Sequence, residues 1–503
     1  MQELLLEEPR PLAATSLRAL IVDLNNFARY PTLSIGYLVA ALRTSGIAVE
    51  VLCPLAYGVE AVERERPERL WDHIQRRVYL STHPGFAKCR DVLHSWRSRR
   101  TARPRAHVLQ EVRAALQRRP QVVLLSAYLD HYAYCVAIGA VAHELGVPVM
   151  IGGPMFSNPE IARAWLDVPG IVLVAGTEVE NTLPGLVRDV VAGADLLVHP
   201  GVVLPDGRRS PTAERAEDLD DLPRPDFDDF PWNLYRERVI PIMASRGCQW
   251  AKCAFCSDIL TANGKSYRSR NSASILSEMR EQAERYASKN FIFLDIKLNS
   301  DVALWRRLIE KTQDAVPGAR WIGTVHVDLR RDNGLSAEDL AAAAQNGMAR
   351  ISFGLESGSQ RVLDAMDKGC AVERNCLFLE QAHAAGLSVR ATMMQGFPGE
   401  KAQDLELTTH FLERHRERID RIRMSRFKLI PGVKIHNRML ASHSSYPELR
   451  SARWDMRAGR AALGLGSSKN LAYRRFESRL LRIVHEINKR PLRSGAEIFD
   501  GLM

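Results

Sequence analysis

Residues 247–256 read GCQWAKCAFC and place three cysteines, Cys248, Cys253 and Cys256, on one short segment. Four residues separate the first pair and two separate the second. Thiolates at this spacing can all turn toward one soft metal centre, whereas a disulfide would use only two of them. A structural zinc site normally takes a fourth Cys or His, while three ligands on one loop suit an iron–sulfur cluster with one open iron. The segment therefore predicts a cluster that takes part in chemistry.

Two other interpretations of these cysteines remain open. They could be unrelated core thiols, because cysteine often serves as a small buried hydrophobe. They could also bind zinc, although a zinc ribbon needs a second cysteine pair at a distance. Cys370 and Cys376 are separated by five residues, and Cys53, Cys89 and Cys135 stand alone. The spacing favours the iron–sulfur interpretation.

The two hundred residues around and after this segment alternate between apolar runs and amphipathic stretches. Strands are predicted near residues 239–244 and 291–295, within 350–359 and 389–400, each running into a turn, and at 426–432, and helices near 274–286, 336–345, 360–366, 374–385 and 404–414. Repeated strand–helix units indicate a parallel sheet, here a partial barrel. In such barrels the chemistry lies where strands end, so the polar residues there are candidates for function.

The cysteine loop and the strand ends that follow it resemble the radical S-adenosylmethionine (SAM) enzymes. That family usually has three residues between its first two cysteines, whereas this chain has four, residues 249–252. The resemblance implies that Cys248, Cys253 and Cys256 hold a 4Fe-4S cluster whose open iron binds SAM. It also implies an electron donor, such as flavodoxin or ferredoxin, that supplies the electron for cleaving SAM.

The same resemblance implies residues that contact SAM. Glu356, in the segment GLESG, matches a position that helps hold SAM in similar enzymes, and Gly396 opens a turn, GFPGE, that matches the turn under the adenine. The expected SAM contacts are Phe255, Asp295, Glu356, Ser357, Gln395 and Gly396, with Asp295 matching less tightly. A glutamate after a strand can instead cap the next helix, and glycine–proline turns are common anywhere.

The first two hundred residues predict a separate doubly wound parallel sheet. Short apolar strands near 18–23, 47–52, 122–127, 147–154 and 171–176 stop at small or polar residues, with helices between them. Ligands of such sheets bind outside the carboxyl ends of the strands. No G-x-G-x-x-G phosphate fingerprint occurs, which disfavours a nicotinamide cofactor.

This order of elements before a radical-enzyme core resembles the cobalamin-binding domain of cobalamin-dependent radical SAM enzymes. The resemblance implies that cobalamin contacts Asn25, Asn26, Ser126, Ala127, Gly152, Gly153, Pro154, Gly176, Thr177 and Glu178. No Asp-x-His-x-x-Gly motif follows the first strand, so a histidine from that motif cannot coordinate cobalt. His131, just past the third strand, is either an alternative ligand or a solvated or capping residue.

We therefore expect an α/β chain of four parts. An amino-terminal doubly wound (Rossmann-like) parallel sheet domain covers residues 1–200, with a basic insertion near 57–120, and an acidic, proline-punctuated linker covers 201–235. A partial (β/α)6 TIM-like barrel covers 236–440, and a mostly helical carboxyl-terminal segment covers 441–503.

Composition adds little about the substrate. The net charge of +10 and the five arginines within 97–105 invite a nucleic-acid interpretation, yet no RNA-binding module accompanies them. A solvated helix face is one alternative, and an anionic cofactor, peptide or sugar-phosphate substrate would be served equally well. The chain opens with no signal peptide and has no run of about eighteen apolar residues, so we expect a cytoplasmic protein that does not enter the membrane.

The resemblance implies a radical SAM enzyme, most simply a C-methyltransferase. In that account a deoxyadenosyl radical removes a hydrogen from an unactivated carbon of a small-molecule or peptide natural product, and methylcobalamin supplies the methyl group. Alternatives are methylation of an sp2 carbon or a phosphorus centre, a rearrangement or cyclisation without methylation, a radical enzyme without corrinoid, and tRNA or RNA modification. A non-enzymatic metal-binding scaffold is a further alternative. The sequence names neither the substrate nor a catalytic residue beyond the cofactor ligands.

Overall fold

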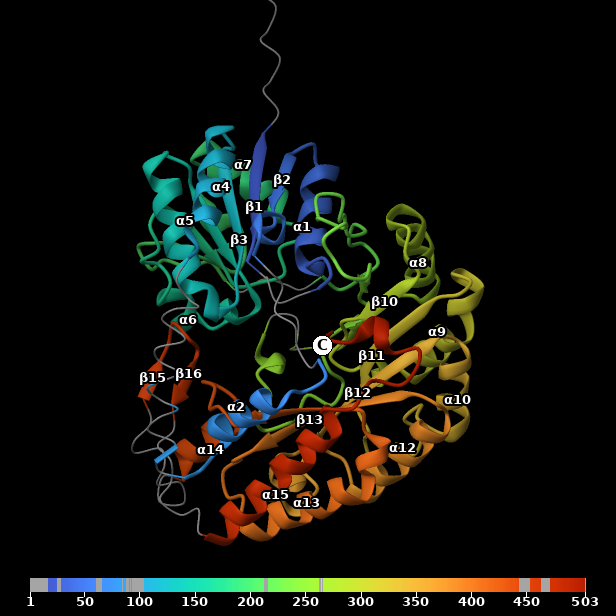
Figure 1. Cartoon of the computed structure of the whole chain (residues 1–503). Helices are drawn as coiled ribbons and strands as arrows, with labels where there is room; N and C mark the ends of the chain where they lie inside the picture. Colours follow the sequence, from blue (N-terminus) through green and yellow to red (C-terminus); the bar gives the residue numbers. More distant parts are fainter. Residues whose placement is uncertain are drawn as a thin grey trace, which may run out of the picture.

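The computed structural model contains two six-stranded sheets, each covered by helices (Figure 1). It describes residues 17–24, 29–59, 66–83, 85–86, 90, 92, 104–211, 216–261, 264, 266–442, 453–462 and 471–502. Within these ranges, no helix is both long and apolar enough to cross a membrane. Four of the five arginines within 97–105 lie outside the described residues, as do Asn25 and Asn26.

The first sheet is doubly wound, as predicted. Its order is β2 (Ala48–Leu52), β1 (Arg18–Asp23), β3 (Val122–Ser126), β4 (Val149–Gly152), β5 (Ile171–Ala175) and β6 (Val202–Val203). The first five strands are parallel, and β6 is antiparallel to β5. The helices are α1 (Leu33–Thr44), α4 (Ala106–Gln117), α5 (Tyr132–Glu144), α6 (Pro159–Arg163) and α7 (Leu183–Ala192).

Strand β1 shows why the strands of this sheet read as continuous apolar runs. Ile21 packs into a core cluster with α1 and α7, whereas Leu20 and Val22 pack into a second cluster with α4 and α5. Alternate side chains of a strand point to opposite faces, so a sheet with helices on both faces buries every residue of its central strands.

The second sheet is an open partial barrel. Its order is β14 (Arg421–Arg426), β13 (Ser388–Gln395), β12 (Met348–Glu356), β11 (Arg320–Val325), β10 (Asn290–Phe293) and β7 (Ile240–Ile242), and all neighbours are parallel. The helices between them are α8 (Ser272–Tyr286), α9 (Val302–Ala315), α10 (Ala337–Gln345), α11 (Gln360–Ala365), α12 (Val372–Ala384) and α13 (Ala402–His415). This confirms the predicted six-stranded barrel.

Two predictions about this barrel were wrong. Strand β11 and helix α9 were missed, because β11 reads RWIGTV and its central Gly323 hides the apolar pattern. A Cβ on Gly323 would come within 2.9 Å of Leu298 Cδ2, so close packing explains the glycine. The last strand was expected at 426–432 but is β14, Arg421–Arg426. It is an edge strand with polar exposed positions, and the apolar residues after it, such as Leu429, pack in a separate cluster with Phe397.

The carboxyl-terminal segment reaches both ends of the barrel. It contains α14 (Lys434–Ala441), a hairpin of β15 (Arg453–Asp455) and β16 (Arg460–Ala462), and α15 (Leu471–Asn488). Helix α15 packs on α13, where Arg479 pairs with Glu413 at 2.5 Å. After α15 the chain returns to the amino ends of the strands, where Phe499 and Leu502 pack against Val239.

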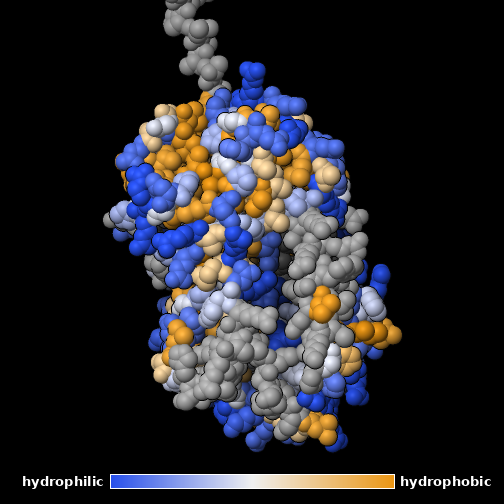
Figure 2. All heavy atoms as spheres, turned by 90° about the vertical axis from the view of Figure 1, so that its left-hand side faces the viewer, coloured by the Kyte–Doolittle hydropathy of each residue, from blue (hydrophilic) through white to orange (hydrophobic). Residues whose placement is uncertain are grey.

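The predicted basic insertion near 57–120 divides into two parts. Helix α4 belongs to the first sheet, since Val112 and Leu116 pack in the same cluster as Leu20. Helix α2 (Leu70–Leu80) instead lies against α15, below the first sheet in Figure 1. On the face shown in Figure 2, hydrophobic residues gather in the half that carries the first sheet.

Candidate active site

The cysteine loop is closed at its base and tied to the barrel. Strand β8 (Ser245–Arg246) enters it and pairs antiparallel with β9 (Arg268–Ser269). Gly247 has φ +85°, and a Cβ there would lie 2.1 Å from the Ser266 carbonyl oxygen, so only glycine fits. Between the second and third cysteines, Ala254 N donates to Met366 O at 2.7 Å, and Ile435 N donates to Ala254 O at 2.8 Å.

The three thiols are free and half-buried. Burial raises the pKa of Cys256 to about 12. Burial also raises the pKa of Cys253, with the charge of Cys248 adding to the effect and that of Lys368 opposing it. Bringing such thiolates together is unfavourable unless a positive centre stabilises them, and a coordinated metal does so.

The spacing of the sulfur atoms separates the metal interpretations. Among the described residues, one group of three potential ligand atoms lies within 4.8 Å of one another, and it contains none of these cysteines. Three sulfurs on a single zinc ion would lie about 3.8 Å apart, because each is ~2.3 Å from the metal. The loop therefore fits a multi-iron cluster better than one zinc ion.

A lysine that the sequence analysis missed lies beside this loop. Lys368 Nζ donates to Glu356 Oε1 at 3.2 Å and lies 5.8 Å from the centroid of the Phe255 ring. Its burial disfavours the charge, but Glu356 and Cys253 outweigh that cost and raise the pKa of Lys368. Glu356 ends β12 with φ +57°, a strained conformation for a residue with a side chain. The pair places opposite charges next to the second cysteine.

The neighbouring turn explains how Lys368 is positioned. Trp250 Nε1 donates to Asp367 O at 2.8 Å, and the Trp250 ring lies flat against Gly369. Gly369 has φ +65°, and a Cβ there would lie 2.2 Å from Trp250 Cζ2. The only signal in the sequence for this arrangement was the glycine after Lys368, which carries no motif by itself.

Two further residues near the loop follow β10 and β11. His326 Nε2 is buried and has no hydrogen-bond partner. Burial, together with the charges of Lys368 and Lys297, lowers the pKa of His326 well below its usual value. Lys297 Nζ donates to Asp328 Oδ2 at 2.6 Å in a buried ion pair. His326 and Asp328 were missed because β11 itself was not predicted.

Asp295 forms two hydrogen bonds with the segment that leads into the cysteine loop. Its Oδ1 accepts from Ser245 Oγ at 2.5 Å, and its Oδ2 accepts from Ala244 N at 3.1 Å. Burial raises the pKa of Asp295 to about 6, although these hydrogen bonds oppose the shift. Asp295 thus fixes the strand that leads into the cysteine loop.

The remaining predicted SAM contacts lie at the ends of β12 and β13. Ser357 Oγ lies 3.1 Å from Thr408 Oγ1 and accepts from Ser359 N, so it supports the turn into α11. Gln395 Nε2 donates to Glu477 Oε1 at 2.5 Å. Gly396, with φ +80°, donates its N–H to Glu400 Oε2 at 2.8 Å.

Helix α15 reaches this same turn. Tyr473 OH donates to Glu400 Oε2 at 2.6 Å, and Glu477 accepts from Gln395. Both α15 residues are buried. The carboxyl-terminal segment therefore helps to shape the turn that was predicted to lie under the adenine.

A groove lies at the carboxyl ends of β3, β4 and β5 in the first sheet. Its lining includes seven predicted residues: Ser126, Ala127, Gly152, Gly153, Pro154, Thr177 and Glu178. Apolar side chains such as Leu38 and Leu183 complete it. A Cβ on Gly152 would meet only the Ala175 carbonyl oxygen, at 3.8 Å, so this backbone is open to a ligand.

Two other glycines of the first sheet have a different explanation. A Cβ on Gly153 would lie 2.2 Å from Ala127 O, and one on Gly176 would lie 2.2 Å from Phe156 O. Close packing of backbone segments requires glycine at both positions, and Gly153 also lines the groove. His131 is buried and not solvated: its Nδ1 accepts from Tyr128 N at 3.2 Å, and burial lowers its pKa to about 4. The capping alternative describes it.

Ion pairs join this groove to the cysteine loop. Glu178 Oε1 accepts from Arg268 NH2 at 2.6 Å, and Glu180 Oε1 pairs with Arg246 NH2 at 2.5 Å. Ser157 Oγ also donates to Leu260 O at 3.2 Å. Arg246 lies two residues before the first cysteine and Leu260 four after the third, so the carboxyl ends of the two sheets face each other.

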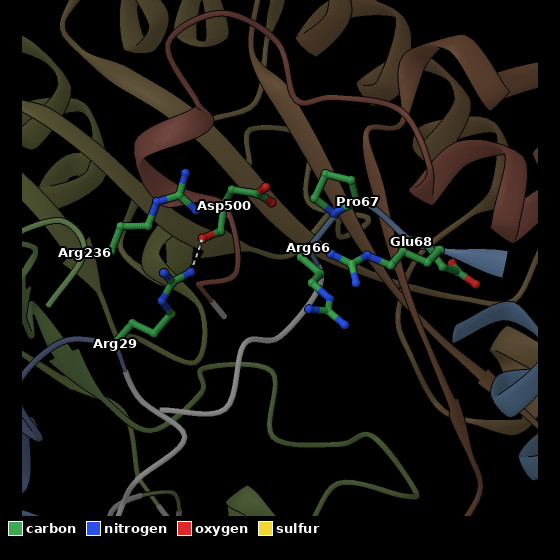
Figure 3. A pocket seen from close by; sticks show the side chains of 7 residues that line it. Arg29, Arg66, Pro67, Glu68, Arg236 and Asp500 are labelled. Atoms are coloured by element: carbon green, nitrogen blue, oxygen red, sulfur yellow. Dashed lines mark hydrogen bonds between the residues drawn. The ribbon is translucent and has the colours of Figure 1, made fainter. Parts of the chain in front are cut away.

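A second hollow, of about 420 Å³, lies at the opposite end of the barrel (Figure 3). It is lined by Arg29, Arg66, Pro67, Glu68, Arg69, Arg236 and Asp500. Arg29 NH1 donates to the Asp500 carbonyl oxygen at 3.3 Å. Because Arg236 precedes β7 and Asp500 pairs with Arg421 at the start of β14, the hollow is at the amino ends of the strands. Barrel chemistry occurs at the other end.

Residues 242–412 match the sequence profile of the radical SAM superfamily. The chain contains a radical SAM domain. The matched range includes the cysteine loop and the strands from β10 to β13, which confirms the resemblance drawn from the sequence.

Relatives and solved structures extend beyond the radical SAM domain. An uncharacterized methyltransferase of Pyrococcus horikoshii is 27% identical over 306 residues, which are 59% of this chain and 64% of that protein. The cobalamin-dependent SAM radical enzyme OxsB, solved with aqua-cobalamin, superposes with a TM-score of 0.66 at 16% identity and covers 90% of this chain. The radical SAM methyltransferase TsrM of Kitasatospora setae superposes with a TM-score of 0.60 at 18% identity over 85% of this chain. These likenesses show the fold. This chain spans 64% of OxsB and 76% of TsrM.

Proposed function

We propose that the protein is a cobalamin-dependent radical SAM methyltransferase. The observation that carries the proposal is the set of ion pairs, Glu178 with Arg268 and Glu180 with Arg246, that holds the groove of the first sheet against the cysteine loop. Two cofactors that act on one substrate must lie close together, and this arrangement brings their candidate sites face to face.

The residues present fit the groups that the proposal requires. Cys248, Cys253 and Cys256 form a soft donor set on one loop, which suits an iron–sulfur cluster with one open iron. The groove of the first sheet offers apolar walls and the open backbone of Gly152 to a large planar ligand such as cobalamin. The strand ends of β12 and β13 offer a buried carboxylate, Glu356, and a glycine turn to SAM.

When bound, these groups supply one-electron cleavage of SAM and a transferable methyl group. The role of the protein's own residues is to position these groups and to shield them. Glu356 would accept a hydrogen bond from the amino group of SAM, and the hydrogen bond from Lys368 orients that carboxylate. His326 Nε2 offers a buried acceptor near the cysteine loop. Helix α15 holds the turn at Gly396 through Glu400, which accepts hydrogen bonds from Tyr473 OH and from Gly396 N.

The substrate that we propose is a small molecule or a peptide that is methylated at an unactivated carbon. The cysteine loop is half-buried, and ion pairs join the two sheets beside it, which favours a compact or extended substrate over a folded nucleic acid. An external one-electron donor, such as flavodoxin or ferredoxin, completes the reaction that we propose.

The test uses anaerobically purified protein loaded with cobalamin, a chemical reductant and SAM labelled in its methyl group. We expect label in the corrinoid together with release of S-adenosylhomocysteine, and formation of 5′-deoxyadenosine. Release of 5′-deoxyadenosine without label in the corrinoid would leave a radical SAM enzyme but remove the methyltransferase assignment. A Cys253→Ala variant is the control, because it should form no 5′-deoxyadenosine.

A further inference from the structure

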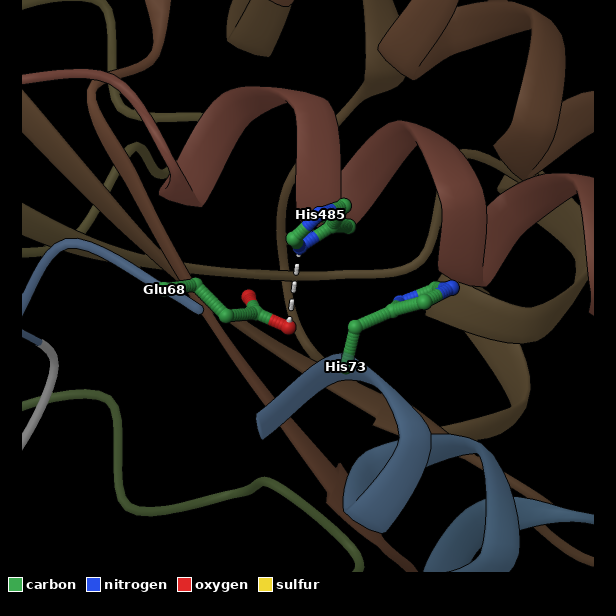
Figure 4. A group of neighbouring side chains, drawn as sticks. All are labelled: Glu68, His73 and His485. Atoms are coloured by element: carbon green, nitrogen blue, oxygen red, sulfur yellow. Dashed lines mark ion pairs between the residues drawn. The ribbon is translucent and has the colours of Figure 1, made fainter. Parts of the chain in front are cut away.

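We propose that Glu68, His73 and His485 form a binding site for one divalent transition-metal ion, with Zn²⁺ the ion that the donor set fits best. Each residue offers one ligand atom, and the three atoms all lie within 4.8 Å of one another (Figure 4). His485 Nδ1 lies 3.4 Å from Glu68 Oε1. Two ligands on tetrahedral zinc lie about 3.3 Å apart, because each is ~2.0–2.1 Å from the metal. The third ligand atom, on His73, lies within 4.8 Å of the other two.

The hydrogen bonding of these side chains is incomplete in a way that a cation would correct. Glu68 Oε1, His73 Nδ1 and His485 Nδ1 are buried and have no hydrogen-bond partner. Glu68 is 7% exposed and His73 is 8% exposed. Buried polar atoms without partners are costly, and here three of them converge on one point. One metal ion would satisfy all three at once.

The surroundings hold the ligands in place. Arg76 NH1 pairs with Glu68 Oε2 at 2.5 Å, which leaves Oε1 directed toward the histidines. Glu68 N donates to Asn488 O at 2.9 Å, and the rings of His73 and His485 stack with centroids 4.5 Å apart. Partners of this kind orient metal ligands and raise the affinity of the site.

The donor set selects the class of metal. Two imidazole nitrogens and one carboxylate oxygen suit Zn²⁺ and neighbouring transition metals, whereas Mg²⁺ and Ca²⁺ prefer oxygen ligands throughout. Three protein ligands leave a fourth position for water. The site lies between α2 and α15 and includes no residue of the cysteine loop, so it does not depend on the proposed function.

The consequence would be a clamp between segments far apart in the sequence. Helix α2 follows the first strands of the chain, whereas α15 carries Tyr473 and Glu477, which contact the turn at Gly396. Thr82, just after α2, also donates to Glu477. A metal at Glu68, His73 and His485 would therefore fix α15 in the position where it shapes that turn.

The experiment measures zinc in the full-length protein carrying its cluster and cobalamin, after stripping with a chelator, incubation with Zn²⁺ and desalting. We expect about one zinc ion per chain in the wild type and in the control His83→Asn, because His83 is an exposed histidine just beyond α2. His73→Asn and His485→Asn should bind zinc at least about tenfold more weakly. Zinc that persists in both variants, or a wild type that binds none, would overturn the proposal.

A second measurement needs no variant and so does not depend on how His73→Asn folds. X-ray absorption at the zinc edge of the loaded wild type should show only nitrogen and oxygen neighbours, with the signature of imidazole. Sulfur neighbours at about 2.3 Å would place the zinc on the cysteine loop and refute the site. Thermal unfolding should also shift to higher temperature with Zn²⁺ in the wild type, and an unchanged transition would count against the clamp.

Discussion

Glu178 lies between two arginines of the other half of the molecule: its Oε1 accepts from Arg268 NH2 at 2.6 Å, and its Oε2 lies 3.3 Å from Arg246 NH1. All three side chains are buried or nearly so. Burial alone would raise the pKa of Glu178, but the hydrogen bond from Arg268 and the charge of Arg246 outweigh it and lower that pKa. This carboxylate is the main polar link between the groove and the cysteine loop.

The first prediction concerns that link. Glu178→Gln should lower the free energy of unfolding by about 3 kcal/mol, because it leaves the buried guanidinium of Arg268 without its carboxylate and removes one of the two carboxylates that pair with Arg246. Denaturant unfolding of the purified protein measures the change. The control is Glu310→Gln, an exposed residue that pairs with Arg307 at 3.5 Å and should change stability by less than about 0.5 kcal/mol. Equal effects of the two substitutions would contradict the buried link.

The second prediction concerns the cluster ligands. Cys253→Ala should reduce the iron content of anaerobically reconstituted protein at least about tenfold, because the cluster loses one of three protein ligands. Cys376→Ala, on α12, should retain wild-type iron. Iron and acid-labile sulfide assays measure both variants. Full iron content in Cys253→Ala would show that the loop does not hold the cluster.

The third prediction separates a steric clash from backbone strain. Gly369 and Gly386 both have positive φ, +65° and +81°, but a Cβ on Gly369 would meet the Trp250 ring whereas one on Gly386 would meet nothing within 4 Å. Gly369→Ala should therefore displace the cysteine loop and lower both iron content and SAM cleavage at least about tenfold. Gly386→Ala should cost only the strain of about 1–2 kcal/mol and keep its iron. Loss of iron in both variants would point to strain alone.

The fourth prediction follows from the pKa of Asp295. Burial raises that pKa from near 4 to about 6, so ionisation of this residue costs stability as the pH rises from about 4 to about 6. Asp295→Asn removes the ionisation, so its free energy of unfolding relative to wild type should rise across this window by about 3 kcal/mol. Unfolding curves at several pH values measure the difference. Asp221→Asn, at an exposed position, should show no such slope.

Much of the fold could be predicted because it depends on local pattern. Buried parallel strands read as short apolar runs, and this located all five parallel strands of the first sheet. The prediction of strands failed where packing against residues distant in the sequence determines which residue the strand carries. Gly323 in β11 is required by Leu298, and the edge strand β14 carries arginines and lacks the apolar run by which the other strands could be recognised.

The candidate site divides in the same way. The three cysteines could be recognised in the sequence because they stand in one loop at a spacing typical of metal ligands. Seven of the residues predicted to contact cobalamin line the groove of the first sheet. Lys368 and His326 carry no sequence signal, because their importance comes from burial beside Glu356 and the cysteine loop. The hydrogen bonds of Asp295 to Ser245 and Ala244 could not be shown by sequence spacing, and its predicted contact with SAM stays a prediction.

The most direct test of the account is the iron, sulfide, zinc and corrinoid content of the chain after anaerobic purification with cobalamin supplied. The account predicts about four irons and one corrinoid per chain. Iron without corrinoid would remove cobalamin from the proposed function. Zinc in place of iron on the cysteine loop would contradict the account as a whole.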